Sequence, residues 1–157
     1  MKSILSILTL LLAFNITVAQ TTAIPDANFE QALINMGYDN TIDGQVLTAN
    51  INTVTYLNVQ GLMISDLTGI QDFTDLINLW CPYNQLTTLD VTQNAVLTHL
   101  TCSSNQLTNL DVTQNNALIE MWCSFNQLTN IDVTENIALT LLDCGFNQIT
   151  NLDVTQN

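Results

Sequence analysis

The chain has 157 residues, of which 14 are Asp or Glu and only one, Lys2, is Lys or Arg, so its formal net charge is −13. Such an acidic molecule repels nucleic acid and anionic membrane surfaces at long range, which argues against both as partners. Hydrophobic residues make up 47% of the chain, too many for an acidic disordered polymer, so a packed core is expected.

The N-terminus has the layout of a secretory signal peptide. Lys2 is followed by an apolar run over residues 4–14, and Thr17 and Ala19 fit a small-x-small cleavage site. The run is too short to span a bilayer, and no later apolar stretch is long enough. We therefore predict a signal peptide over residues 1–19, export to the medium or the cell surface, and no membrane insertion.

Residues 20–53 are predicted to form a small N-terminal helical cap. Phe29, Leu33 and Ile34 recur at helical spacing after Asp26, as in a short amphipathic helix that closes the end of a repeat array. The segment DNTIDG, residues 39–44, faintly resembles a calcium loop but lacks the other acidic ligands and the distal Glu of an EF-hand. A turn rich in Asp, Asn and Gly is favoured, so no cofactor is expected, with calcium as the alternative.

Residues 54–157 repeat with a period of 21. The cysteines keep this step, and so do a column of Asn, a column of Leu or Ile and a column of Asp: Cys81, Cys102, Cys123 and Cys144; Asn84, Asn105, Asn126 and Asn147; Leu86, Leu107, Leu128 and Ile149; Asp90, Asp111, Asp132 and Asp153. A period of this length indicates a solenoid whose units stack on one another. The 21-residue units start at residues 76, 97, 118 and 139, after a divergent 22-residue unit that starts at 54. The pattern continues unchanged to Asn157, so we expect further repeats or a partner that covers that end.

Each 21-residue unit reads Leu-x-x-Leu-x-Cys-x-x-Asn-x-Leu, which resembles the leucine-rich-repeat signature with cysteine at the third apolar position. The divergent unit ends in ISDLTGI, similar to the units of internalin-type bacterial leucine-rich repeats. The resemblance implies a leucine-rich-repeat solenoid (horseshoe), with a parallel β-sheet on the concave face and short 3₁₀ or extended turns on the convex face. It also implies that the Asn column bonds to the backbone at the bend.

The Asp column is predicted to cap a turn on the convex side. Leu89 and Val91 are expected in the core, with Asp90 between them pointing out. Asp90 and Gln93 have capping-box spacing, which recurs in every unit with Glu135 in the third copy. We predict one helical or 3₁₀ turn in each unit.

The cysteines have three interpretations. Packing as compact hydrophobes is favoured. Disulfides between adjacent strands would be strained by parallel side-chain directions, and a single-file column cannot surround zinc tetrahedrally. His99 lies three residues from Cys102, an odd offset that puts the two on opposite faces of a strand. Since no other nucleophilic set can be assembled, the chain is predicted not to be an enzyme.

The outward residues of the strands vary between units and form the predicted ligand-binding surface of the concave face. Exposed aromatic rings anchor protein interfaces, and flat rings also stack on sugars. The alternative is that these rings only shield neighbouring strands from water. The predicted binding residues are Tyr56, Asn58, Asn78, Trp80, Tyr83, His99, Thr101, Glu120, Trp122, Phe125, Asp143 and Phe146.

The predicted function is non-enzymatic recognition of a protein ligand, in adhesion or protein–protein interaction at the cell surface. A carbohydrate-binding or targeting module of a longer polysaccharide-active protein is one alternative, with a glycan as the partner. A passive structural spacer is the other.

Overall fold

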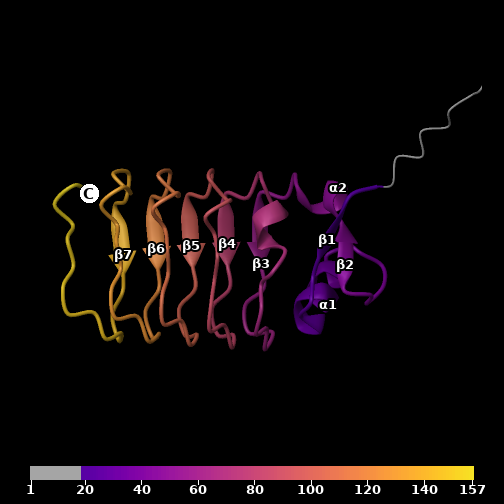
Figure 1. The fold of residues 1–157 in the computed structure, drawn as a ribbon, viewed down its shortest axis with the longest axis horizontal. Coiled ribbons are helices and arrows are strands. Elements are labelled where there is room, and N and C mark those ends of the chain that lie inside the picture. The colour runs from indigo at the N-terminus through magenta and orange to yellow at the C-terminus, as the bar shows by residue number, and fades with distance from the viewer. Residues whose placement is uncertain (1–18) are drawn as a thin grey trace, which may run out of the picture.

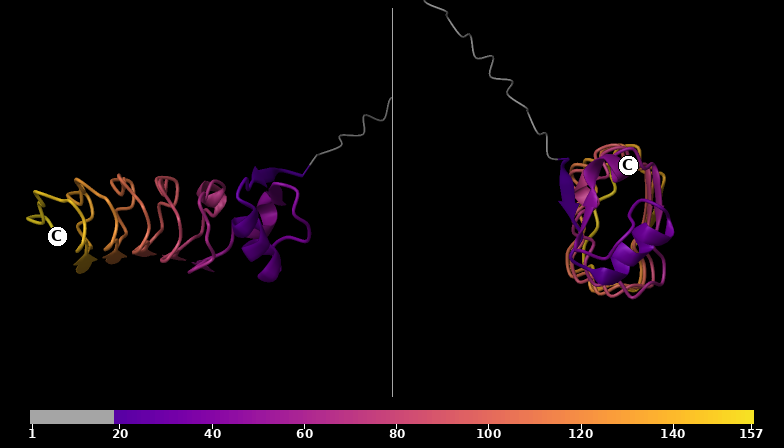
Figure 2. Two further views of the ribbon diagram at one scale, coloured as in Figure 1. Left: turned by 90° about the horizontal axis from the view of Figure 1, so that it is seen from below. Right: turned by 90° about the vertical axis from the view of Figure 1, so that its right-hand side faces the viewer.

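The computed structural model describes residues 19–157, so the predicted signal peptide lies outside the described residues except at its last position. The described chain is a stack of turns along one axis, closed at one end by a small cap (Figure 1). The strands lie on one side of the stack and the return turns on the other, and the turns superpose when seen down the axis (Figure 2). This is the predicted leucine-rich-repeat solenoid.

The sheet has five short parallel strands in chain order, each followed by a return turn. They are β3 (Tyr56–Asn58), β4 (Asn78–Trp80), β5 (His99–Thr101), β6 (Glu120–Trp122) and β7 (Leu141–Asp143). The register pairs equivalent positions of successive units, so that Trp80 lies beside Thr101 and Thr101 beside Trp122. A sequence column is therefore also a spatial row across the sheet.

Alternation along each strand sends the middle residue inward and its two neighbours outward. The middle residues Leu57, Leu79, Leu100 and Met121 are buried, and so are Cys81, Cys102 and Cys123 just beyond the strands. Leu89 and Val91 fill the core from the opposite side, as predicted. No unit can bury these side chains alone, so stacking supplies the apolar burial that stabilises the array.

The return turns differ from the predicted capping box. Asp90 Oδ1 accepts hydrogen bonds from the Thr92 backbone N–H at 3.0 Å and from the Thr92 hydroxyl at 2.7 Å, and the other units repeat this pair. The carboxylate thus caps a single turn, as predicted, which the Asn94 N–H closes by donating to the Val91 carbonyl at 2.9 Å. The reciprocal hydrogen bond from Gln93 that would complete a capping box is not formed in the described structure, and the carboxylate makes an Asx turn instead. Among the described units only the divergent one has a helical turn here, η1 (Ile70–Asp72).

Two ladders of asparagine hold the bends. In the predicted one, Asn105 donates to the carbonyls of Cys81 and Cys102 and accepts from the Leu86 N–H of the preceding unit. A second ladder on the convex side was not predicted: Asn115 donates to the carbonyls of Val91 and Asn94. Its column is Asn94, Asn115, Asn136 and Asn157, so the same 21-residue step could have revealed it.

The cap contains the predicted helix, α1 (Ala27–Asn35), which starts at Asp26 and buries Phe29 and Leu33. It also contains an unpredicted antiparallel pair, β1 (Thr21–Ala23) with β2 (Gln45–Leu47), and a short helix α2 (Thr48–Ile51). The cap is bonded to the first unit, because Asp26 Oδ2 accepts from the Ser65 N–H and hydroxyl. None of the helices in the described residues is long and apolar enough to cross a membrane.

The DNTIDG segment is organised by a protein carboxylate. Buried Glu30 accepts hydrogen bonds through Oε1 from the backbone N–H groups of Asp43, Gly44 and Gln45. In the described residues no three His, Cys, Asp or Glu side chains gather where they could hold a metal ion.

Candidate binding groove on the sheet face

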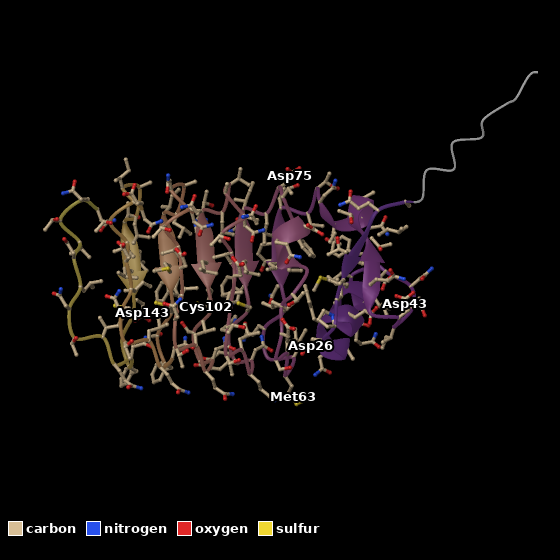
Figure 3. All side chains as sticks on the ribbon, viewed as in Figure 1. Asp26, Asp43, Met63, Asp75, Cys102 and Asp143 are labelled. Carbon is tan, nitrogen blue, oxygen red and sulfur yellow. The ribbon has the colours of Figure 1, made fainter. Side chains whose placement is uncertain are left out.

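The cysteines form a column inside the stack, in which Cys102 is labelled in Figure 3. All four are free thiols; Cys81, Cys102 and Cys123 are fully buried and Cys144 is half-buried. Burial raises the pKa of the Cys81 and Cys123 thiols from the ordinary 9.0 to about 12, and burial with the neighbouring thiols raises that of Cys102. Buried, protonated thiols are poor nucleophiles and poor metal ligands, so this column packs the core.

His99 and Cys102 lie on opposite sides of the sheet, as predicted from the odd offset. His99 is half-exposed on the outer face, where its Nδ1 lies 2.7 Å from the Thr98 hydroxyl, while Cys102 is fully buried. This separation prevents a Cys–His pair.

The outer face of the sheet is hollowed by a groove of about 570 Å³ centred on β5, which we call the β5 groove. Nine of the predicted binding residues line it: Asn78, Trp80, Tyr83, His99, Thr101, Glu120, Trp122, Phe125 and Asp143. Exposed aromatic side chains of the units on either side form its walls, and half-buried residues of the unit between them form its floor.

Three predicted residues lie outside the β5 groove. Tyr56 and Asn58 are on β3, and the Asn58 amide oxygen accepts from the Gln60 N–H. Phe146 stacks on Phe125 with ring centroids 4.2 Å apart, which supports one wall from outside. The β5 groove thus covers less of the sheet than the predicted strip of binding residues, which ran along the whole stack.

Six lining residues were not among the predicted binding residues: Gln60, Leu79, Pro82, Ser103, Ser104 and Ser124. Ser103 and Ser104 matter most, because they bring hydroxyl groups to the floor. Ser124, on the following unit, donates its hydroxyl to Ser103 Oγ at 3.2 Å. The 21-residue columns carried this signal, because Ser104 stands in the row of Tyr83 and Phe125, and Ser103 and Ser124 stand in the row of Pro82.

Tyr83, Ser104, Phe125 and Phe146 all have left-handed backbones, with φ between 54° and 57°. The equivalent residue of the divergent unit is Gly61, which has φ of 66°. This region is strained for L-residues with bulky side chains and favours Gly or Asn. Ser104 shares this φ without a ring, so the left-handed conformation belongs to the bend of the repeat, and the rings of Tyr83 and Phe125 are exposed there.

We expect Tyr83→Gly to raise the free energy of unfolding by about 0.5–1 kcal/mol. Relief of the left-handed strain outweighs the entropy that glycine adds to the unfolded chain, and the Tyr83 ring is 64% exposed, so little packing is lost. Urea unfolding of the two proteins measures this change. Ser104→Gly, at the same φ without a ring, is the matched control and should gain a similar amount. A loss of stability in Tyr83→Gly alone would mean that the ring stabilises the fold.

The β5 groove is acidic. Glu120 and Asp143 line it, and since Lys2 is the only Lys or Arg, neither has such a partner within the described chain. Asp143 uses one carboxylate oxygen to accept from the Gly145 N–H, which leaves the other for a ligand. Chemically the groove combines flat apolar walls, hydroxyl groups and uncompensated negative charge.

Comparison with known proteins bears on the family and the fold of the chain. No family model matches the chain. Internalin J of Listeria monocytogenes (serotype 4b, strain F2365) is 44% identical over 74 residues, which are 45% of this chain and 8% of that protein. The chain therefore spans a small part of this curated relative.

Solved structures give the same result. The functional domain of InlJ from Listeria monocytogenes, described as including a cysteine ladder, matches with a TM-score of 0.80 and 37% identity over 91% of this chain and 32% of that one. The internalin InlF of the same species shares the fold, with a TM-score of 0.68 and 18% identity over 85% of this chain and 46% of that one. With the 21-residue cysteine units and the internalin-like first unit, these matches show that the chain is an internalin-like leucine-rich-repeat protein.

Proposed function

We propose that this chain is a non-enzymatic recognition module that binds a protein ligand through the β5 groove. The observation that carries the proposal is a groove on the sheet face walled by exposed aromatic rings, Trp80 and Tyr83 on one side and Trp122 and Phe125 on the other. Aromatic residues at the centre of a recessed surface are the usual anchors of protein interfaces.

The rigidity of the support favours binding over simple shielding. The walls stand on strands of one parallel sheet, whose bends are held by the two asparagine ladders. A groove on such a scaffold loses little conformational entropy when it binds a ligand. Rings that only shielded the backbone would not need the recess between them.

The setting of this activity belongs to the same proposal. The signal-peptide pattern of residues 1–19 and the similarity to internalins support export, so we place the binding at the cell surface or in the medium. Adhesion is the role that we assign to it.

The test is a binding survey on arrays of extracellular proteins and of glycans, with the native chain and a Trp80→Ala/Trp122→Ala variant. We expect the native chain to bind at least one protein and the variant to bind it at least tenfold more weakly, because two central rings are lost. The matched control is Val96→Ala/Ile137→Ala, which removes two exposed apolar side chains that do not line the groove.

Each other outcome contradicts the proposal in its own way. Binding to glycans alone, with the same dependence on both tryptophans, would favour the carbohydrate-binding alternative. Binding of no ligand, or equal binding by all three proteins, would favour the structural spacer.

A further inference from the structure

The side chains along the β5 groove alternate in size across the sheet. Trp80, Thr101 and Trp122 are register partners on three adjacent strands, so a small residue lies between two indoles. At the bend the same order recurs, with Ser104 between Tyr83 and Phe125. The unit that starts at residue 97 is therefore the floor of a slot that runs parallel to its own strand.

The width of the slot selects what can enter. Adjacent strands lie about 4.8 Å apart, so the backbones that carry Trp80 and Trp122 are separated by about 10 Å. A flat group in van der Waals contact with a ring on each side needs about 7–8 Å between the two rings. The slot thus has room for a single planar layer between the indoles, with the Thr101 side chain below it.

The charge of the slot selects the chemistry of that layer. Glu120 and Asp143 line the groove without any Lys or Arg partner in the described chain. Aromatic faces attract cations, and nearby carboxylates strengthen that preference. The floor hydroxyls of Thr101, Ser103 and Ser104 can accept hydrogen bonds from N–H groups that reach them.

We infer that the β5 groove binds an arginine side chain of its protein partner, with the guanidinium stacked between Trp80 and Trp122 and paired with Glu120. A guanidinium is planar and stacks on aromatic faces, whereas an ammonium is compact and more strongly hydrated. This inference rests on the proposed function, because it names the chemistry of the partner that the groove recognises. Glu120 and Asp143 have no Lys or Arg partner in the described chain, and the arginine of the protein partner supplies that positive charge.

The experiment uses short blocked peptides, Gly-Arg-Gly, Gly-Lys-Gly and Gly-citrulline-Gly, and follows the indole N–H signals in NMR spectra. The chain has two tryptophans, both in the walls, so each signal reports on one side of the slot. We expect the arginine peptide to shift both signals with a dissociation constant in about the millimolar range. The citrulline peptide has the same shape without the charge and should bind about tenfold more weakly, with the lysine peptide in between.

Three variants test the geometry. Thr101→Trp fills the slot and leaves both walls, so it should abolish arginine binding, whereas Thr101→Ser should preserve it. Glu120→Gln should weaken the arginine peptide about fivefold and leave the citrulline peptide unchanged. The control for charge is Glu135→Gln, an exposed carboxylate outside the groove, which should change neither. The unliganded spectra show whether each variant is folded.

Equal binding of the arginine and citrulline peptides would overturn the assignment of a cation. Arginine binding by Thr101→Trp as strong as by Thr101→Ser would overturn the slot. No indole shift with any peptide up to tens of millimolar would overturn the inference as a whole. The proposed function has a separate readout, because loss of a protein ligand on replacing both tryptophans would still support it.

Discussion

Raising the pH from about 9 to about 11 is expected to destabilise the folded chain by about 5 kcal/mol through Cys81 and Cys123 alone. Burial raises the pKa of both thiols from 9.0 to about 12 in the folded state. The sign follows from the raised value: the contribution is fully present below the ordinary thiol pKa and is lost as the pH rises through the folded one. In that interval the unfolded chain releases a proton that the folded chain retains, at up to about 1.4 kcal/mol per pH unit for each thiol.

A loss of this size is comparable to the whole stability of a small domain. Cys102 adds to it in the same direction, since its pKa is raised as well. Circular dichroism during thermal unfolding at a series of alkaline pH values measures the effect. The control is a variant with Ala at positions 81, 102 and 123. It should be less stable at neutral pH because of the cavities, but its stability should fall much less steeply above pH 9. Parallel slopes in the two proteins would exclude the thiols as the cause.

Asn105→Leu is expected to lower the free energy of unfolding by about 3 kcal/mol. The substitution keeps the shape of the side chain but leaves the buried Leu86 N–H without a partner. It also removes one hydrogen bond to each of the Cys81 and Cys102 carbonyls, which keep those from Asn84 and Asn126. An unsatisfied buried group costs about 1–3 kcal/mol, and each lost hydrogen bond costs about 0.5–1.5 kcal/mol. A thermal or urea unfolding curve gives the difference directly.

The second ladder supplies a matched comparison. Asn115→Leu also removes two hydrogen bonds to carbonyls, those of Val91 and Asn94, but the Oδ1 of Asn115 has no hydrogen-bond partner. Removing that buried oxygen offsets part of the loss, so we expect Asn115→Leu to cost only about 1–2 kcal/mol.

Burial alone would give the opposite order for the two asparagines, because Asn115 is 0% exposed and Asn105 is 8% exposed. The comparison therefore separates hydrogen-bond satisfaction from burial as the cause. A larger loss for Asn115→Leu than for Asn105→Leu would contradict this account of the two ladders.

The two asparagine columns also show how far a repeated sequence can be interpreted. The Asn105 column falls directly after a strand, where the repeat signature assigns it a role, and that role is confirmed. The Asn115 column is equally regular, but it ends the convex turn, where no local pattern says whether the side chain points in or out. Its carbonyl partners lie 21 and 24 residues earlier in the chain, so only stacking brings them within reach.

The Asp column shows a case in which a local sequence pattern exists but fits two different hydrogen bonds. Asp90 and Gln93 have the spacing of a capping box, but a competing bond to Thr92 is closer in sequence and needs no helix. In two other units, the equivalent hydrogen bonds from Thr113 and from Thr134 lower the pKa of Asp111 and of Asp132. Spacing alone could not choose between two local bonds that the same carboxylate can accept.

The amino-acid sequence by itself determined the unit of this protein: its length, its core columns, its bend, the fold class and the helix that starts at Asp26. It could do so because these features depend on residues within one turn, repeated until their columns are unmistakable. The tertiary structure decided which outward side chains act together. Trp80 and Trp122 are 42 positions apart in the chain, yet they lie on the same face of the sheet on either side of Thr101, because parallel pairing converts the repeat into a distance of two strands. The β5 groove and its acidic lining are properties of that pairing, and no unit possesses them alone.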